Sequence, residues 1–303
     1  MSHRLPITIS RACLALTLLC LLAADAWARP LGAPTLRVIP RPRNTNTAGG
    51  VFGGWLMSQM NQAANAVAGR RTRGRSRTLA VNKMSFVKPV KLGEVVSIYT
   101  KVEKVGRAAM TVKVEAYKRH LYSDKQVKIT EASFKVAAVD GKGRARRIPT
   151  RKATVLGRMA DGIAGAAFKL KKRSRGKSAG EAAGEPAIRL YPQASEANGS
   201  GFMQTGLLMS QMDLAGTTAA TAHSKGRVVT VAVDRGTFLG QPRTGDEVSV
   251  HAHVKKVGRT SMDVFVETWS RSPKAKAPVK INQAMFKFVA LDKDNRPKEV
   301  PGL

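Results

Sequence analysis

Cysteine is almost absent from this chain of 303 residues, and both of its cysteines, Cys13 and Cys20, lie near the start. The remainder therefore offers no disulfide, no thiolate metal site and no cysteine nucleophile. Aromatic residues make up only 5% of the chain. No basic-aromatic motif of the kind found in RNA-recognition modules is present, so base-specific reading of nucleic acid is not indicated.

Acidic residues are also scarce, with 20 Asp and Glu against 52 Lys and Arg and a formal net charge of +32. Such a charge attracts polyanions. Much of it is concentrated in the run from Arg70 to Arg77 and in residues 169–177. We expect these runs to contact RNA, an anionic membrane or an acidic partner surface. The alternative is that they are solvated loops without a partner.

The first 29 residues have the composition of a leader. Arg4 and Arg11 accompany an apolar run over residues 12–24, and Ala26-Trp27-Ala28 is a small-x-small cleavage pattern. This composition is typical of a secretory signal. A mitochondrial presequence is the rival, because no acidic residue precedes Asp25, and an uncleaved membrane anchor is the third interpretation.

An internal repeat organises the rest of the chain. A shift of 152 positions aligns its two halves without a gap, from Asn46 with Asn198 to Pro149 with Pro301. We therefore expect a first repeat over residues 35–149, a basic linker over 150–187 and a second repeat over 188–303. Within the linker, residues 154–170 have the composition of a short helix.

Each repeat has the same pattern of elements. Residues 55–68 are rich in Leu, Met and Ala on nearly every face, which predicts a helix buried on all sides. The segments 95–105, 108–119 and 129–140 alternate apolar and polar residues, which predicts antiparallel strands. The sequence thus predicts an α+β fold, with a curved antiparallel sheet wrapped around one helix in each repeat.

Several motifs occur in order and twice: "PRNTNTAGGVFGGWLMSQM", "VVTVAVDRGTFLGQPRTGDEV", "KKVGRTSMDVFVETW" and "FKFVALDKDNRPKEVP". They resemble the hotdog-fold acyl-CoA thioesterases, both the bacterial short-chain hydrolases and the animal enzymes that carry two hotdog units in one chain. The resemblance implies a double hotdog with units joined edge to edge, further oligomerisation, and hydrolysis of acyl-CoA thioesters between the units. It implies no cofactor, because the CoA thioester is the substrate.

Thioester hydrolysis needs a carboxylate to activate water or attack the carbonyl, and donors for the oxyanion. Gly53 and Gly54 begin the first predicted helix, where bare backbone amides can meet a carbonyl. The bacterial enzymes carry an Asp just before this helix, but Gly50 stands there in the first repeat and Phe202 in the second. By resemblance to the animal enzymes, the remaining acid is Asp213 on the second helix.

Two unequal sites follow. Site one combines the loop 49–54 with Asp213, and site two combines the loop 201–206 with Asn61, the counterpart of Asp213. Site two has no acid, so we expect hydrolysis at site one only. The alternative interpretations are that Asp213 caps or salt-bridges at a helix surface, and that the glycines serve tight helix packing.

Further candidates are Arg107 and Arg259, which lie in matching "VGR" turns and by resemblance contact the CoA phosphates. The alternative is that both arginines are solvated and contact no ligand. His251 and His253 share a strand face, but no third metal ligand is apparent, so no metal site is expected. We expect a mitochondrial acyl-CoA thioesterase, because CoA is abundant in the mitochondrial matrix. The rival is a degenerate hotdog that serves as a structural or RNA-contacting subunit of a mitochondrial assembly.

Overall fold

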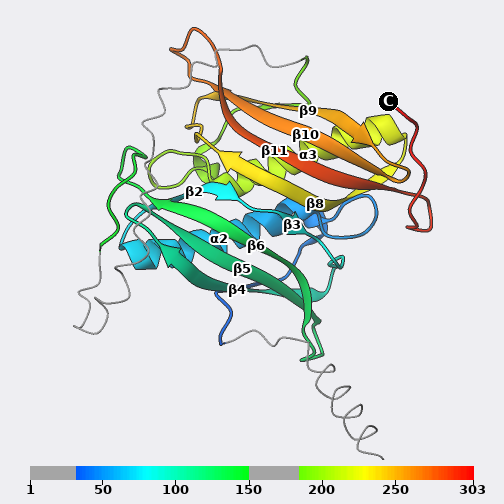
Figure 1. The fold of residues 1–303 in the computed structure, drawn as a ribbon, viewed down its shortest axis with the longest axis horizontal. Helices are drawn as coiled ribbons and strands as arrows, with labels where there is room; N and C mark the ends of the chain where they lie inside the picture. Colours follow the sequence, from blue (N-terminus) through cyan, green and yellow to red (C-terminus); the bar gives the residue numbers. More distant parts are fainter. Residues whose placement is uncertain (1–31, 150–183) are drawn as a thin grey trace, which may run out of the picture. The chain divides into compact units, whose positions relative to one another are not determined.

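The computed structural model describes residues 32–149 and 184–303, and residues 34–303 form one compact unit. Its described strands form one continuous 11-stranded sheet in which every pairing is antiparallel (Figure 1). The strand order along the sheet is β1-β4-β5-β6-β2-β8-β11-β10-β9-β7, with β3 paired to β8. The first five belong to the first repeat and the last five to the second, so the sheet reads symmetrically from its middle.

The predicted helix and strands are confirmed in both repeats. The first repeat contains β1 (Leu36–Val38), α2 (Gly53–Thr72), β2 (Ser76–Val81), β3 (Met84–Ser85), β4 (Glu94–Val105), β5 (Ala109–His120) and β6 (Val127–Ala138). The second contains β7 (Ile188–Leu190), α3 (Thr205–Ser224), β8 (Arg227–Phe238), β9 (Glu247–Val257), β10 (Ser261–Arg271) and β11 (Val279–Leu291). The two helices begin and end at positions related by the same 152-residue shift.

The two repeats join where β8 meets β2 and β3 in the middle of the sheet (Figure 1). Ala80 pairs with Thr237, and Met84 pairs with Val233. The chain interrupts β2 and β3 at Asn82 and Lys83, whereas β8 is continuous over the equivalent positions. Backbone hydrogen bonds therefore link the repeats directly.

The helices α2 and α3 pack against each other as well as against the strands of their own repeat. Glycines allow the close approach. A Cβ atom on Gly54 would lie 2.8 Å from the Cα of Ser210, and one on Gly206 would lie 2.7 Å from the Oγ of Ser58. The hydroxyl of Ser210 also donates to the carbonyl of Gly54 at 2.8 Å. Tight packing is therefore one role of these glycines.

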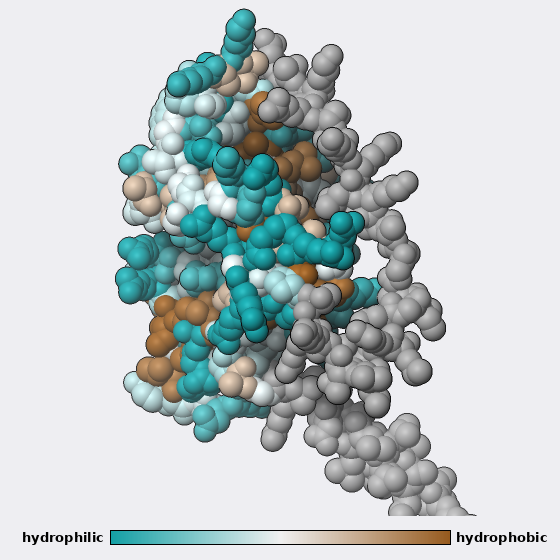
Figure 2. All heavy atoms as spheres, turned by 90° about the vertical axis from the view of Figure 1, so that its left-hand side faces the viewer, coloured by the Kyte–Doolittle hydropathy of each residue, from teal (hydrophilic) through white to brown (hydrophobic). Residues whose placement is uncertain are grey.

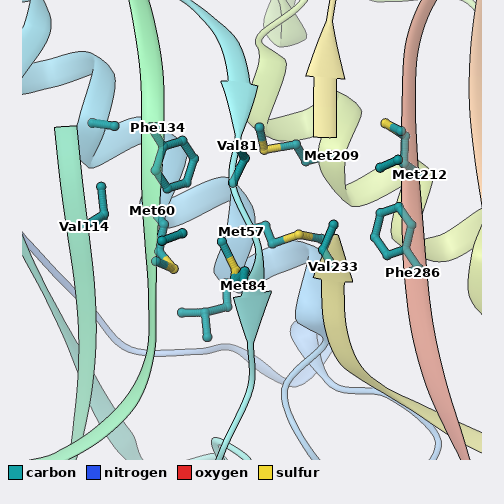
Figure 3. Packing of buried hydrophobic residues seen from close by; sticks show 14 of the residues in the cluster. Met57, Met60, Val81, Met84, Val114, Phe134, Met209, Met212, Val233 and Phe286 are labelled. Carbon is teal, nitrogen blue, oxygen red and sulfur yellow. The ribbon is translucent and has the colours of Figure 1, made fainter. Parts of the chain in front are cut away.

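A single main hydrophobic core runs through both repeats. Figure 3 shows Met57, Met60 and Met84 from the first repeat facing Met209 and Met212 from the second across the β2–β8 junction. As expected, α2 is largely buried, and its exposed positions are Gln62, Ala66 and Arg70. These positions are four residues apart and form one narrow stripe.

The predicted leader, the predicted helix over residues 154–170 and the basic run 169–177 lie outside the described residues. Among the residues that the structure describes, no helix has both the length and the apolar character needed to cross a membrane. On the face of the molecule in Figure 2, hydrophilic residues predominate and hydrophobic ones gather in separate areas.

Candidate active site at the helix N-termini

Asp213 on α3 lies at the N-terminus of α2, which belongs to the other repeat. Its Oδ2 accepts a hydrogen bond from the amide of Gly54 at 2.7 Å, and its Oδ1 accepts one from the hydroxyl of Thr230 at 2.7 Å. Phe52, the N-cap residue of α2, provides no side-chain cap. Asp213 therefore caps this helix from the opposite repeat, and its negative charge meets the positive end of the helix dipole.

The carboxylate of Asp213 is fully buried, with 0% of the residue exposed. Burial raises the pKa of Asp213 to about 6, because removing the charged form from water outweighs the hydrogen bonds from Thr230 and Gly54, which lower it. At pH 7 the group is about nine-tenths ionised. A carboxylate with a pKa close to the working pH is suited to act as a general base.

Gly53 and Gly54 border this carboxylate. The amide of Gly53, the first residue of α2, has no acceptor within the helix because of its position. A Cβ on Gly53 would lie 3.3 Å from Asp213 Oδ2 and 3.1 Å from Thr230 Cβ. The structure thus brings together the three residues that the sequence assigned to site one. It also shows that the amide of Gly54 already donates its hydrogen bond to Asp213.

Site two has the same framework but a different arrangement. Asn61 accepts a hydrogen bond at Oδ1 from the hydroxyl of Thr78 at 2.6 Å, as Asp213 does from Thr230. The Nδ2 of Asn65 donates to the same oxygen at 3.2 Å. Asn61 is therefore held in a network within its own repeat, and the described hydrogen bonds include none between its side chain and Gly206.

A cavity of about 550 Å³ opens beside Asn61 at the N-terminus of α3. Carboxamides and hydroxyls dominate its walls, with contributions from Gln59, Asn61, Asn65, Gln204 and Thr205. The sequence predicted a shared crevice at the acid, but this cavity lies at the site that has none. The cause is local, because Asp213 fills its own site by bonding to Gly54 while Asn61 leaves the amides at α3 uncovered.

The two positions where the bacterial pattern has an acid differ in their surroundings. A Cβ on Gly50 would have no neighbour closer than 3.8 Å, so a side chain fits there. Phe202 instead packs against the first repeat, since its ring lies 3.3 Å from a Cβ placed on Gly143. The guanidinium of Arg243 lies 4.6 Å from the same ring. Phe202 is thus part of the packing at the end of the second repeat.

Arg107 and Arg259 are exposed in the turns between β4 and β5 and between β9 and β10. Neither lies in the cavity beside Asn61 or in the group around Asp213. Their predicted contact with CoA phosphates stays a prediction.

The run from Arg70 to Arg77 makes several internal contacts. Arg75 donates to the hydroxyl of Ser200 and to the carbonyl of Gly199, both in the second repeat. Arg71 donates to the carbonyl of Pro149 at 3.3 Å. Burial lowers the pKa of Arg77. Part of this basic run therefore holds the fold together in addition to exposing charge.

His251 is buried on β9, where its Nε2 lies 3.1 Å from the hydroxyl of Ser249. The ring of His253 lies 5.4 Å from that of Phe265. Among the described residues, no group of three or more His, Cys, Asp or Glu side chains gathers as metal ligands do.

The sequence interpretation missed the threonines that position Asp213 and Asn61. Thr230 and Thr78 occupy equivalent positions in the two repeats. Each lies on the strand that directly follows the helix whose residue it contacts. A signal was present, because both threonines align under the 152-residue shift. The contacts of these threonines could not be read from the sequence, because they depend on how β2 lies across α2 and how β8 lies across α3.

Known proteins are similar to both repeats. The family model described as "Thioesterase superfamily" matches twice, over residues 48–122 and 200–277. An uncharacterized acyl-CoA thioester hydrolase of Zymomonas mobilis, ZMO0511, is 44% identical over 119 residues, which are 39% of this chain and 80% of the relative. The acyl-CoA thioester hydrolase YciA of Escherichia coli K12 is 37% identical over 123 residues, which are 40% of this chain and 93% of the relative.

Solved structures are also similar to this chain. The hexameric thioesterase y2039 from Yersinia pestis is 36% identical and matches 41% of this chain and 100% of its own, with a TM-score of 0.39. An acyl-ACP thioesterase from Bacteroides thetaiotaomicron matches 84% of this chain and 96% of its own, with a TM-score of 0.54. Its identity of 15% relates the folds alone. From the two family matches and these relatives, this chain belongs to the hotdog thioesterase superfamily.

Proposed function

We propose that the protein hydrolyses acyl-CoA thioesters at site one, between two hotdog units paired as a double hotdog within one chain. The observation that carries the proposal is the position of Asp213. It places a carboxylate with a pKa of about 6 against the amide of Gly54, across the boundary between the repeats. This unites a candidate base and candidate oxyanion donors in one place.

In the proposed reaction, the thioester carbonyl oxygen takes the place of Asp213 Oδ2 at the Gly54 amide. The displaced carboxylate then accepts a proton from the attacking water, and the Gly53 and Gly54 amides stabilise the oxyanion that forms. The hydroxyl of Thr230 holds Oδ1 throughout and keeps the carboxylate oriented. When the tetrahedral intermediate collapses and the C–S bond breaks, the protonated carboxyl of Asp213 returns this proton to the sulfur. CoA then leaves as the thiol and the acyl group as the free acid.

The substrate class comes from the relatives. ZMO0511 and YciA are named as acyl-CoA thioester hydrolases. These relatives give no support to the rival interpretation of a catalytically degenerate structural or RNA-contacting subunit.

The decisive experiment measures release of CoA thiol from acyl-CoA substrates, from acetyl to palmitoyl, by the purified protein. We expect turnover that falls at least about a hundredfold in Asp213→Asn, because loss of one positioned catalytic group costs about this much. Asn61→Ala, the matched change in site two, should retain turnover. A wild-type protein inactive on every chain length, or an Asp213→Asn variant as active as wild type, would refute the proposal.

Three further expectations extend this proposal. We propose a mitochondrial location, which a reporter fused to residues 1–29 can test by import.

We propose that the paired units assemble further, because y2039 is described as hexameric. Light scattering of the purified protein measures the size of the assembly. The contact of Arg70 to Arg77 with a polyanion is testable by salt-dependent binding to RNA and to anionic vesicles.

A further inference from the structure

A groove of about 950 Å³ crosses the edge of the sheet in the first repeat. Its walls come from β1, the short 3-10 helix η1 (Pro42–Asn44), the first turns of α2 and parts of β4 and β5. Four arginines line it: Arg37, Arg41, Arg43 and Arg119. None of the described residues lining it is acidic. Like charges so close together repel one another, and an anionic ligand would relieve this repulsion.

The second repeat shows what this edge looks like when its charge is neutralised. Arg37 and Arg119 correspond to Arg189 and Arg271, and there Glu247 binds both. Its Oε1 accepts from Arg189 Nη1 at 2.9 Å, and its Oε2 accepts from Arg271 Nε at 3.0 Å. The first repeat therefore lacks a neutralising acid that the second repeat has.

One substitution between the repeats accounts for the contrast at the first pair of arginines, and two more add to it. Val95 replaces Glu247, while Arg41 and Arg43 stand where the second repeat has Gln193 and Ser195. All three differences make the first groove more positive. One such difference is unremarkable on a basic protein, but three in one direction at one groove indicate a ligand.

Neutral groups hold two of the four arginines in place. Arg119 Nη1 donates to the carbonyls of Leu121 and Ser123, both at 3.1 Å, and Arg37 Nε donates to the hydroxyl of Ser97 at 3.3 Å. The ion pairs of the described residues include none of the four arginines. Their charge is thus positioned but not neutralised, which suits guanidinium recognition of phosphate.

The same groove offers an aromatic wall and shares a lining residue with the cavity of site two. Trp55, partly exposed on α2, lines the groove, and an indole can stack on a planar base. Gln59, one turn further along α2, lines both the groove and the cavity beside Asn61. The carboxamides of that cavity can donate to and accept from amide groups. Groups suited to phosphate, base and amide recognition are therefore present in the groove and in the cavity that shares Gln59 with it.

We propose that this groove and cavity form a second site for CoA or its thioester, which binds the ligand but does not hydrolyse it. The arginines take the phosphates, Trp55 stacks on the adenine, and the cavity takes the amide-bearing arm. Hydrolysis fails there because Asn61 stands where site one has Asp213. The identity of the ligand rests on the proposed function, whereas the phosphate-binding groove rests on the contrast between the repeats.

The test is calorimetric titration of CoA into the full chain and into the double variant Arg41→Gln/Arg43→Ser, which installs the residues of the second repeat. Both side chains are exposed, so the fold should be retained. We expect CoA binding at least tenfold weaker in the double variant and within twofold of wild type in the matched control Arg189→Gln. Val95→Glu, which restores the neutralising acid, should weaken binding in the same direction. Unchanged affinity in both groove variants would overturn the proposal.

Competing ligands distinguish CoA from other sources of phosphate. We expect 3′,5′-ADP to compete with CoA, and pantetheine and inorganic phosphate to compete at least a hundredfold less well. If inorganic phosphate competes as well as 3′,5′-ADP, the groove is a general anion site and the proposal is wrong.

A second variant tests why the site is silent. Adding Asn61→Asp to the Asp213→Asn protein should restore turnover, because the bound thioester then meets a carboxylate. Absence of turnover despite intact CoA binding would contradict this explanation. The two proposals can be refuted separately. If the wild-type protein binds CoA through the groove but shows no turnover, hydrolysis at site one is refuted. If it shows turnover but its CoA affinity does not depend on the groove residues, the second site is refuted.

Discussion

The N-termini of α2 and α3 are equivalent positions in the two repeats, yet they meet different side chains. At α2, Asp213 bonds to the Gly54 amide and is fully buried. At α3, the side chain of Asn61 bonds to Thr78 and a cavity lies open. Asp213 thus caps the N-terminus of α2, whereas a cavity remains beside the N-terminus of α3.

This contrast shows how a duplicated chain can place different side chains at two equivalent positions. A single-repeat protein that pairs with itself must carry the same residues at both sites. Duplication within one chain removes that constraint, so Asp213 and its counterpart Asn61 can differ. The outer grooves differ in the same way, because Glu247 neutralises two arginines in the second repeat and Val95 does not in the first.

The largest expected effect concerns the pH dependence of stability. Folding raises the pKa of Asp213 from 3.8 to about 6, so the native protein holds a proton that the unfolded chain releases in this range. The contribution of Asp213 to stability therefore falls as pH rises from about 4 to above 6, by about 3 kcal/mol in total. Urea unfolding of wild type and Asp213→Asn between pH 4 and 7 measures it. The stability of the variant relative to wild type should increase with pH, and a constant difference would contradict the burial of an ionisable group.

The next effect concerns the contact between the helices. Gly54→Ala should destabilise the protein by about 2 kcal/mol, because the new Cβ meets the backbone of Ser210 at 2.8 Å. Gly50→Ala is the matched control four residues earlier, where the nearest atoms are 3.8 Å away. It should change the free energy of unfolding by less than about 0.5 kcal/mol. Thermal or urea unfolding of both variants checks this, and equal losses would argue against close helix packing at Gly54.

A third prediction restores a polar group in the loop of site one. Gly50→Asn places a carboxamide in this loop, at a position where an added Cβ meets no atom closer than 3.8 Å. We expect turnover about tenfold above wild type, since a well-placed hydrogen-bonding group contributes at least this much. The rate of thiol release measures the gain, with Gly50→Ala as the control for size. A rise in both variants would show that side-chain volume, not polarity, is responsible.

The smallest effect concerns the basic run. Arg75→Ala removes contacts to Ser200 and Gly199 across the repeats, but the side chain is exposed. We expect a loss of about 0.5 kcal/mol in the free energy of unfolding. The equivalent Arg227 contacts the carbonyl of Asp292 within its own repeat. A loss above about 2 kcal/mol for Arg75→Ala would show that the basic run holds the repeats together far more than these contacts suggest.

The fold was predictable because the repeat doubled every signal. The predicted helix over 55–68 and the strand at 95–105 each had a second copy with the same pattern. The helix begins two residues earlier and ends four residues later than predicted, and the strand begins one residue earlier. The pairing of Asp213 with the loop before Gly54 followed only from the resemblance to the animal enzymes. The sequence could not predict whether the side chain of Asp213 fills the space at the N-terminus of α2 or leaves it open. Whether Asp213 leaves or fills its crevice depends on a hydrogen bond of 2.7 Å between residues 159 positions apart.

The arginine groove was hidden for a similar reason. Arg37, Arg41 and Arg119 are far apart in the sequence, and in a chain with 52 basic residues no single one of them stands out. Only the pairing of β1 with β4 brings them to one edge, and only comparison with Glu247 shows that their charge is not neutralised.

The most direct measurement of the central claim is the pH dependence of kcat/KM for acyl-CoA hydrolysis between pH 4.5 and 8. If ionised Asp213 is the base, the rate rises with pH and levels off above an apparent pKa of about 6, in wild type and in Asn61→Ala alike. In Asp213→Asn this rise disappears together with most of the activity. A profile with the same midpoint and amplitude in Asp213→Asn would contradict the account, because some other group would then carry the reaction.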